Sequence, residues 1–228
     1  MWKEDHMVEL ISAIHRFFYI TIISRKYLYT GQYALWERSQ MNKDNLIILD
    51  VETTGTDIYS DEIIQVSIIN EQGEILLDSY VKPQKHSEWK KAEAIHGITL
   101  EMVVNSPVIE QLKEKIQNII DEADIIVGYN IDAFDIPFLE ESAGINFKDK
   151  DTYDVMLAFA PIYGDYNEYY GNYKWQSLST CASYYNYEFN AHNSLEDTKA
   201  TLYCYQKIKE YKDEIDMIVD EIKQCIHM

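Results

Sequence analysis

Three apolar runs separated by polar turns predict consecutive β-strands in the first half of the chain. The runs occupy residues 46–51, 62–69 and 75–81, and a Gly-Glu turn at residues 73–74 separates the last two. Runs of this length that are rich in Ile, Leu and Val are typical of buried strands. Because consecutive strands with short turns pair with their neighbours, the three segments predict an antiparallel meander.

The spacing of apolar residues changes after residue 100, where they recur every three or four positions, as on one face of a helix. Pro107 in a first turn and Gly144 after a last turn are the expected start and stop signals. The short apolar run at residues 124–127 predicts one more strand. Strands followed by alternating helices and strands predict an α/β fold, a mixed β-sheet (antiparallel meander plus parallel strands) flanked by α-helices. The predicted helices are residues 107–121, 134–143, 153–160, 177–185 and 194–210, with an amphipathic tail at 213–226.

Residues 1–44 differ from the rest of the chain and form a predicted N-terminal extension, whereas residues 45–228 form the main domain with its C-terminal helices. Residues 6–24 are largely apolar but are interrupted by charged side chains, so they predict a helix rather than a transmembrane span. Residues 1–5 lack the basic start of a signal peptide. Two interpretations stay open: a helical extension that packs on a partner or on the domain, and an upstream start that adds sequence without function.

Composition narrows the class of protein. The 228 residues are 46% hydrophobic, which provides a substantial core and excludes wholesale disorder. The three cysteines form no C-x-x-C pair and their number is odd, so buried thiols in a reducing, cytoplasmic setting are favoured over a disulfide framework or a zinc site. The net charge of −19 divides into +1 for residues 1–44 and −20 for residues 45–228. Such an acidic body repels long duplex DNA and favours short contacts at strand ends, where bound metal ions supply positive charge.

Acidic residues concentrate in three short motifs, each beside a predicted strand or helix. The motifs are D-V-E-T-T-G at residues 50–55, N-I-D-A-F-D at residues 130–135 and H-N-S-L-E-D at residues 192–197. Asp50 and Glu52 lie two positions apart on a predicted strand, so their side chains share one face. Carboxylate oxygens suit Mg²⁺ and Mn²⁺, and buried acids need a cation. A histidine beside such a site can take a proton from water near neutral pH, and the combination is typical of two-metal phosphodiester hydrolysis.

Ordinary structural roles compete with metal binding at each acid. The two acids of the first motif could be solvated on an edge strand, and Asp135 could complement a helix dipole. Asp197 could close a capping box that Ser194 opens. The apolar run before the first motif favours a central strand instead, and His192, five positions before Asp197, favours a catalytic cluster.

The three motifs resemble those of the DEDDh 3′→5′ exonuclease superfamily, which includes the epsilon proofreading subunit of bacterial DNA polymerase III and ribonuclease T. The order and separation of D-x-E-T-T-G, N-x-x-x-F-D and H-x-x-x-x-D are similar, over roughly residues 45–210. In the second motif Asp135 matches the family pattern and Asp132 does not. The resemblance implies the ribonuclease H-like fold and two divalent ions, Mg²⁺ or Mn²⁺. It implies four catalytic acids that bind metal, namely Asp50, Glu52, Asp135 and Asp197. It also implies that His192 is the general base.

The resemblance also implies a substrate and a set of contacts. The terminal 3′-hydroxyl is expected against Glu52 and the backbone of the T-T-G turn. The implied reaction releases nucleoside 5′-monophosphates from 3′ ends of single-stranded nucleic acid, with DNA favoured over RNA. An RNA-trimming or oligoribonucleotide exonuclease stays open, as does a non-catalytic module that binds nucleic-acid ends or a polymerase. A DNA polymerase is the implied protein partner, and no membrane partner is expected. The predicted substrate-binding residues are Thr53, Thr54, Gly55, His96 in an A-I-H-G-I segment, Asn130 and Phe134.

Two further features lie outside the motifs. Asp154 is predicted to support the site or to cap a helix. Residues 163–175 contain six aromatic side chains among Gly and Asn. Aromatic rings in such a loop stack on single-stranded bases in some proteins, and in others they pack on their own fold.

Overall fold

The computed structural model describes residues 45–226, and the predicted N-terminal extension lies outside them. The chain divides into two compact units, with the boundary between Tyr205 and Gln206 of the last helix. The predicted site residues all lie in the unit that ends at Tyr205, which we call the first unit. The strands are β1 (Leu46–Thr53), β2 (Ile63–Asn70), β3 (Ile75–Tyr80), β4 (Ile125–Gly128), β5 (Asp151–Asp154), β6 (Tyr166–Asn167) and β7 (Asn172–Tyr173). The helices are α3 (Lys90–His96), α4 (Leu100–Val103), α5 (Ile109–Glu122), α6 (Asp135–Ala143), α7 (Val155–Tyr163), α8 (Leu178–Tyr184) and α9 (Ser194–Ile226).

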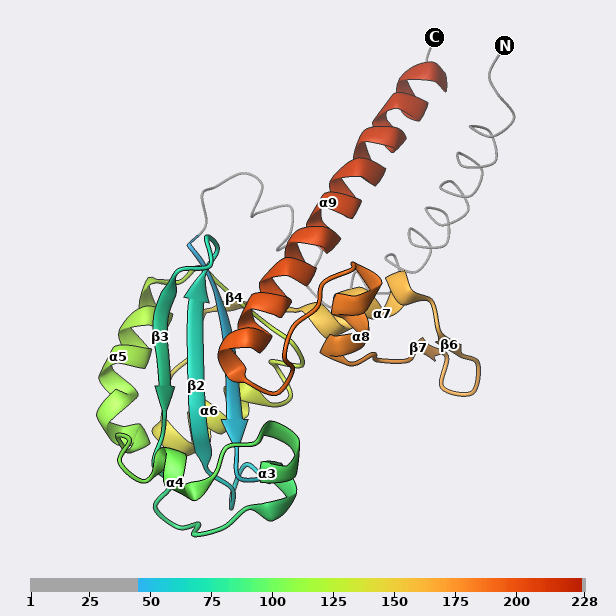
Figure 1. Ribbon diagram of the computed structural model, residues 1–228. Helices are drawn as coiled ribbons and strands as arrows, with labels where there is room; N and C mark the ends of the chain where they lie inside the picture. Colours follow the sequence, from blue (N-terminus) through green and yellow to red (C-terminus); the bar gives the residue numbers. More distant parts are fainter. Residues whose placement is uncertain (1–44, 227–228) are drawn as a thin grey trace. The chain divides into compact units, whose positions relative to one another are not determined.

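A five-stranded mixed sheet in the order β3-β2-β1-β4-β5 forms the centre of the first unit (Figure 1). β2 pairs antiparallel with both β1 and β3. β4 pairs parallel with both β1 and β5. The predicted mixed sheet, with its antiparallel meander, is confirmed. β5 is a strand that the sequence pattern does not predict, because its D-T-Y-D sequence lacks an apolar run and becomes a strand by pairing with buried β4.

The apolar face of β1 builds the main core. Successive side chains of a strand point to opposite sides, so Ile47, Leu49 and Val51 share one face. They join a buried cluster with side chains of α5 and α6, among them Ile116 and Phe138. Full burial of each such side chain stabilises the fold by about 1.5–3 kcal/mol. Figure 1 shows α5 and α6 on this side of the sheet.

The opposite face of β1 is polar and meets the start of α9. Asp50 and Glu52 pair in register with Ser67 and Gln65 of β2, so the four side chains share this face. The buried hydroxyl oxygens of Ser67 and Ser194 lie 2.5 Å apart. The N–H of Ser194 donates to Gln65 Oε1 at 3.4 Å. These contacts hold the first turn of α9 over the two acids of β1.

Some predicted boundaries are wrong for physical reasons. Pro107 lies two residues before α5, outside its first turn, because Val108 occupies the N-terminal cap. The two predicted C-terminal segments form one continuous helix, α9, since the Tyr-Lys-Asp sequence at residues 211–213 contains no helix breaker. The short elements α3, α4, β6 and β7 are too brief to show a periodic pattern. Within residues 45–226, no helix is both long and apolar enough to cross a membrane.

Candidate active site

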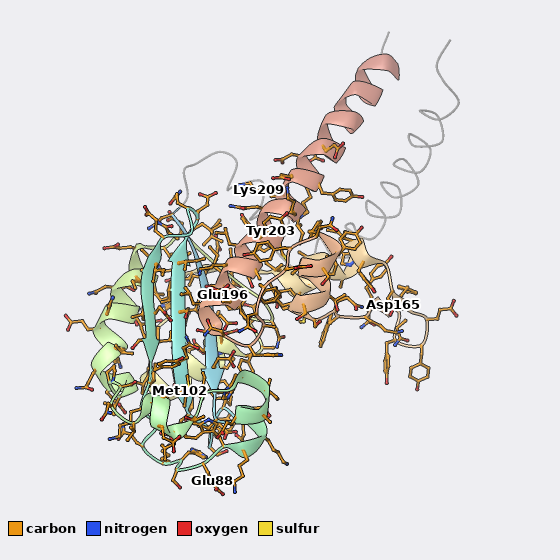
Figure 2. The ribbon with its side chains drawn as sticks, in the orientation of Figure 1. Glu88, Met102, Asp165, Glu196, Tyr203 and Lys209 are labelled. Carbon is orange, nitrogen blue, oxygen red and sulfur yellow. The ribbon has the colours of Figure 1, made fainter. Side chains whose placement is uncertain are left out.

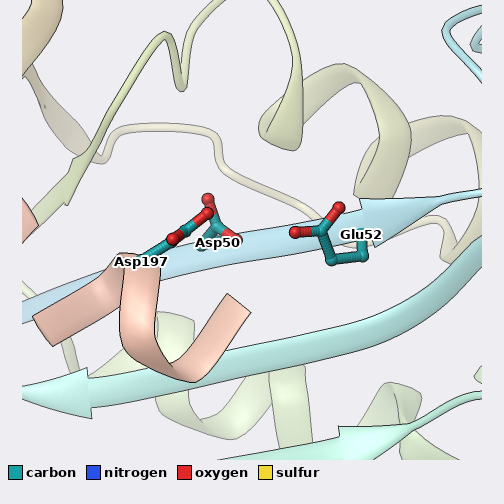
Figure 3. Close-up of side chains that lie close together, drawn as sticks. All are labelled: Asp50, Glu52 and Asp197. Atoms are coloured by element: carbon teal, nitrogen blue, oxygen red, sulfur yellow. The ribbon is translucent and has the colours of Figure 1, made fainter. Parts of the chain in front are cut away.

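Three carboxylates from distant parts of the sequence meet on the polar face of β1. Asp50, Glu52 and Asp197 each contribute one carboxylate oxygen to a group in which all oxygens lie within 4.8 Å of one another. In Figure 3 Asp197 approaches from α9 and lies against Asp50, and the Glu52 carboxylate points toward both. The fold thus brings together three of the four acids that are predicted to bind metal.

The fourth predicted acid, Asp135, lies beside this group and is held by the backbone of β1. Its side chain is only 2% exposed, and its Oδ1 accepts a hydrogen bond of 2.9 Å from the N–H of Val51. The pairing of β1 with β4 stops short of Val51, so the carboxylate takes the place of a continuing strand. Because Val51 separates Asp50 from Glu52, this bond places a fourth carboxyl group next to both.

The loop before α9 differs from the predicted capping box. Asn193, rather than Ser194, caps the helix, because its Oδ1 accepts the N–H of Glu196 at 3.2 Å. The carboxylate of Asp197 instead reaches back to the N–H of His192, which donates to both oxygens at 3.2 Å. His192 adopts a left-handed φ of 68°, and its side chain is exposed. The backbone of His192 is therefore fixed on a carboxylate of the acidic group.

A relay of hydrogen bonds behind the acids sets the position of α9. Oδ1 of Asp78 on β3 accepts the hydroxyl of Ser67 at 3.0 Å and Nε2 of Gln65 at 3.3 Å. A carboxylate only accepts, so it fixes the direction of both donors. The hydroxyl oxygen of Ser67 can then accept a hydrogen bond from the hydroxyl of Ser194. Oε1 of Gln65 accepts a hydrogen bond from the backbone N–H of Ser194. The relay locks the helix that carries Asp197 onto the sheet.

The loop from β4 to α6 is ordered by Asn130 and Asp154. Asn130 has a left-handed φ of 64°, and its N–H donates to Asp154 Oδ1 at 3.0 Å. The same oxygen accepts the N–H of Met156 at 2.9 Å as the cap of α7, which confirms the capping role predicted for Asp154. The ring of Phe134 packs on that of Phe138, with centroids 4.9 Å apart, at the edge of the apolar core.

The T-T-G turn after Glu52 is braced by Asp61. The hydroxyl of Thr54 donates to Asp61 Oδ1 at 3.0 Å and accepts the N–H of Glu62 at 2.9 Å. A Cβ at Gly55 would collide with the carboxylate of Asp61, so only glycine allows this close approach. The brace fixes the backbone that immediately follows Glu52.

His96 supports the same turn from α3. Its Nδ1 accepts the N–H of Ile98 at 3.0 Å, so the proton lies on Nε2, which faces the carbonyl oxygen of Thr53 at 3.3 Å. Burial lowers the pKa of His96, which favours this neutral form. Both ring nitrogens are engaged within the protein, and the substrate contact predicted for His96 stays a prediction.

Burial raises the pKa of each acid in the group, and neighbouring carboxylates add to the shift. Burial, followed by the charges of Asp197 and Asp135, raises the pKa of Glu52 to about 8. Burial, with the charges of its three acidic neighbours, raises the pKa of Asp50 well above its usual range. Burial likewise raises the pKa of Asp135 and that of Asp197, although a backbone N–H bond to each opposes the shift. Without bound cations, the ionised forms of these acids repel one another.

The donor set fits divalent cations. Oδ2 of Asp50 is buried and, among the residues that the structure describes, finds no hydrogen-bond donor. A buried carboxylate oxygen without a donor is costly, and a cation removes that cost. Hard cations bind oxygen at about 2.0–2.6 Å, so one ion joins oxygens that are up to about 4–5 Å apart. Oxygens of Asp50, Glu52 and Asp197 lie within that span.

Sequence reasoning missed the residues that support the acids. Asp61, Gln65, Ser67 and Asp78 belong to no recognisable motif. One signal was available in the sequence I-I-Q-V-S-I-I at residues 63–69, where two polar residues alternate in an apolar strand. Alternation of this kind marks one polar face, and in β2 it is the face that the acids share.

Comparison with known proteins assigns the family. Residues 47–205, which contain all three motifs, match the family model of ribonuclease T-type proteins that is described as exonuclease. The chain belongs to this exonuclease family. It is a 3′–5′ exonuclease of the DEDDh superfamily, as the resemblance of its motifs implies. Membership and the acidic group together indicate dependence on divalent metal.

Relatives of this exonuclease are of very different lengths. The phage protein "Uncharacterized exonuclease CP81" from Escherichia phage 186 is 30% identical over 171 residues, which cover 70% of this chain and 86% of that protein. "3′-5′ exonuclease DinG" of Staphylococcus epidermidis is 27% identical over 79% of this chain, but only 20% of its own length is matched. "DNA polymerase III PolC-type" of Thermotoga maritima is 35% identical over 46% of this chain and 8% of its own length.

Solved structures confirm the fold of the exonuclease. A complex of Escherichia coli exonuclease I with single-stranded DNA superposes with a TM-score of 0.62 and 19% identity. The match covers 75% of this chain and 42% of the exonuclease I chain. The predicted ribonuclease H-like sheet with flanking helices is therefore confirmed.

Proposed function

We propose that this exonuclease removes nucleoside 5′-monophosphates one at a time from the 3′ end of single-stranded DNA, with two divalent ions, Mg²⁺ or Mn²⁺, in its site. The observation that carries the proposal is the group of Asp50, Glu52 and Asp197, whose oxygens lie within 4.8 Å of one another. With Asp135 beside it, this group would supply the carboxylates for two ions: Asp50, Glu52 and Asp197 would hold one, and Asp50 with Asp135 would hold the other. When bound, the ions polarise the phosphate and stabilise charge on the attacking and leaving oxygens.

His192 is the proposed general base. A base must reach the attacking water directly or through one further water, and the exposed imidazole of His192 stands on a backbone that is fixed to Asp197. The imidazole takes the proton of that water as the new bond to phosphorus forms. The bond between phosphorus and the 3′-oxygen of the preceding nucleotide then breaks, which frees the 5′-monophosphate. A proton from solvent turns that oxygen into the 3′-hydroxyl of the shortened strand.

The T-T-G turn, formed by Thr53, Thr54 and Gly55, is the proposed seat of the terminal 3′-hydroxyl, together with Glu52. The Asp61 brace and the close approach at Gly55 support this role, because they hold the backbone still where an end group must be recognised. Other predicted contacts of the terminal nucleotide are His96, Asn130 and Phe134.

DNA is favoured over RNA because relatives of this chain carry names of DNA polymerase III, and several matching structures hold single-stranded DNA. The strongly acidic composition fits an enzyme that grips strand ends rather than long duplexes. Association with a DNA polymerase is part of the proposal, and it is supported by the likeness to PolC-type chains.

One assay tests the proposal. Single-stranded DNA and RNA of one sequence, each labelled at the 5′ end, are incubated with the protein and Mg²⁺ or Mn²⁺, with and without chelator. We expect a ladder that shortens from the 3′ end, faster for DNA, and absent with chelator. Faster shortening of RNA would establish the RNA-trimming alternative, and retention of both strands without shortening would contradict turnover altogether.

A further inference from the structure

An aromatic surface lies on hairpin β6–β7 and on residues 174–175, which follow β7. We call residues 165–175 the aromatic hairpin. At its tip Tyr169 is 88% exposed and Tyr170 is 72% exposed, and after β7 Trp175 is 65% exposed. Large aromatic side chains that gather on one exposed segment mark a site of interaction, because a fold gains by burying them.

The aromatic hairpin presents its rings in a defined way. The N–H of Lys174 donates to the carbonyl of Asp165 at 2.8 Å, and its ammonium pairs with the carboxylate of Asp165 at 3.0 Å, which closes the base. Tyr169 and Tyr170 meet edge to face, with centroids 4.8 Å apart and planes at 90°. In Figure 2 side chains near the labelled Asp165 project away from the ribbon. An edge-to-face pair leaves ring faces open to a flat partner.

The composition of the aromatic hairpin favours bases as that partner. Its eleven residues include five aromatic side chains and no aliphatic one. Protein interfaces are enriched in Met and Arg as well as in aromatic rings, and the hairpin contains neither Met nor Arg. Single-stranded nucleic acid stacks its bases on successive aromatic rings. Stacking tolerates any sequence, because every base has a π-face.

The base of the hairpin adjoins the candidate active site. The hydroxyl of Tyr129 donates to the carbonyl of Gln176 at 2.9 Å, directly after Trp175. Tyr129 follows β4 and precedes Asn130, on the loop that leads to Asp135. β4 is the parallel neighbour of β1, and neighbouring strands lie about 4.8 Å apart. The aromatic surface therefore begins beside the carboxyl end of β4, and the acidic group lies toward the carboxyl end of its parallel neighbour β1.

The charge of the chain also favours stacking over phosphate contacts. Residues 45–228 carry −20, and the hairpin itself holds Asp165 and Glu168 against one Lys174. Affinity that comes from phosphate contacts needs Lys and Arg, which release counterions on binding. An acidic protein that holds a polyanion beyond its metal site has to hold the uncharged bases.

We propose that the aromatic hairpin stacks on bases of the single strand a few nucleotides upstream of the 3′ end that occupies the candidate active site. The inference rests on the proposed function and adds a second contact region to it. It identifies Tyr169, Tyr170 and Trp175 as the rings that bind, and it predicts affinity that depends on bases and little on salt.

The test measures binding in chelator, so that no turnover occurs, by anisotropy of a 5′-fluorescein-labelled oligothymidylate. We expect Tyr169→Ala with Tyr170→Ala to weaken binding by about tenfold or more. The matched control, Tyr169→Phe with Tyr170→Phe, keeps both rings and is expected to bind as tightly as the wild type. Tyr169→Leu with Tyr170→Leu keeps apolar area without a flat ring, and is expected to bind as weakly as the alanine pair.

Abasic oligonucleotides locate the stacked bases. Removing single bases along the strand should weaken binding to the wild type at one or two upstream positions. At those positions, removing the base should not weaken binding to the alanine pair any further, because the rings that would stack on that base are already absent. Between about 50 and 200 mM salt the affinity of the wild type should change little, whereas phosphate contacts would lower it steeply.

Separate outcomes decide between this inference and the proposed function. Hydrolysis of the p-nitrophenyl ester of thymidine 5′-monophosphate, which has no upstream base, tests turnover alone in the wild type. Equal affinity of the alanine pair and the wild type would overturn the inference even where turnover is present. Tight binding by the leucine pair, or a steep salt dependence, would also overturn stacking. Self-association of the wild type that the alanine pair loses, without any change in oligonucleotide affinity, would make a second copy the occupant instead.

Discussion

The two faces of β1 are built from alternate residues of one strand, yet they affect the folded state in opposite ways. Ile47, Leu49 and Val51 are at most 4% exposed and lie in an apolar cluster with α5 and α6. Asp50 and Glu52 lie on the other face, where burial and neighbouring charges raise the pKa of both. The first face lowers the free energy of the folded state, and the second raises it.

The contrast explains why the site is placed here. Grouped acids that repel one another survive only on a backbone that other contacts already determine. β1 is such a backbone, because it is the central strand of the sheet and its reverse face is fully packed. The repulsion is also useful, since it is the free energy that bound cations relieve. The apolar face provides stability, and the polar face provides affinity for metal.

Single substitutions on the two faces should separate these contributions most clearly. Asp50→Asn keeps the shape of the side chain and removes its charge. We expect exonuclease turnover to fall by about a thousandfold or more, since several kcal/mol of charge stabilisation depend on the ions. In chelator the same variant should unfold at a higher temperature than the wild type, because repulsion is reduced. Shortening of a labelled strand and thermal unfolding measure the two effects.

Leu49→Ala on the reverse face is the matched control. It should lower the free energy of unfolding by about 2–5 kcal/mol, while the folded fraction keeps turnover within about tenfold of the wild type. Turnover retained by Asp50→Asn, or a lower unfolding temperature for that variant in chelator, would contradict the division of β1 into a stabilising and a reactive face.

The next effect concerns the proposed base, and the backbone of His192 suggests a clean variant. Its φ of 68° lies in the left-handed region, which glycine adopts without strain. We expect His192→Gly to lower kcat by about a hundredfold or more, because general-base catalysis is lost. Affinity for Mn²⁺, measured by calorimetry, should stay near that of the wild type. Added imidazole should restore part of the rate; unchanged kcat would remove His192 from the mechanism.

The sequence predicts the fold well where pattern and pairing agree. β1, β2 and β3 are long apolar runs, and each is found within two residues of its predicted bounds. β5 escapes prediction because its D-T-Y-D sequence has no apolar period and depends on a neighbouring strand. Hairpin β6–β7 escapes because two-residue strands carry no period at all.

For the site, the sequence predicts which residues bear the chemistry but not how they are held. Asp50 and Glu52 are predictable because a strand repeats every two residues, and Asp197 because of its spacing from His192. The bond from Val51 to Asp135 and the relay from Asp78 are tertiary contacts, over separations that no local pattern encodes. A motif can therefore suggest a function before the fold reveals what positions it.

A smaller effect on substrate discrimination is expected at the T-T-G turn, which follows Glu52 at the end of β1. Thr54→Val removes the hydroxyl that links Asp61 to the backbone of Glu62. We expect discrimination between strands that end in a 3′-hydroxyl and in a 3′-phosphate to weaken by about tenfold, which corresponds to the loss of about one hydrogen bond. Thr54→Ser retains the hydroxyl and should restore discrimination. The measurement is the rate of shortening of both kinds of strand under the same conditions. A loss of discrimination that Thr54→Ser does not restore would indicate a packing defect rather than loss of the hydrogen bonds to Asp61 and Glu62.

The mildest effect is on stability, and its sign follows from the raised pKa of Glu52. Its folded-state pKa of about 8 exceeds the usual 4.5, so the folded state binds more protons than the unfolded state between these values. Stability in chelator should therefore fall as pH rises from about 4.5 to about 8, by a few degrees in Tm. Excess Mg²⁺ should reverse the trend, because bound cations favour the ionised carboxylates. Glu52→Gln should make the dependence in chelator shallower without abolishing it, because the pKa values of Asp50, Asp135 and Asp197 are also raised. A Tm in chelator that rises across this range would show that the polar face of β1 does not store the repulsion inferred for it.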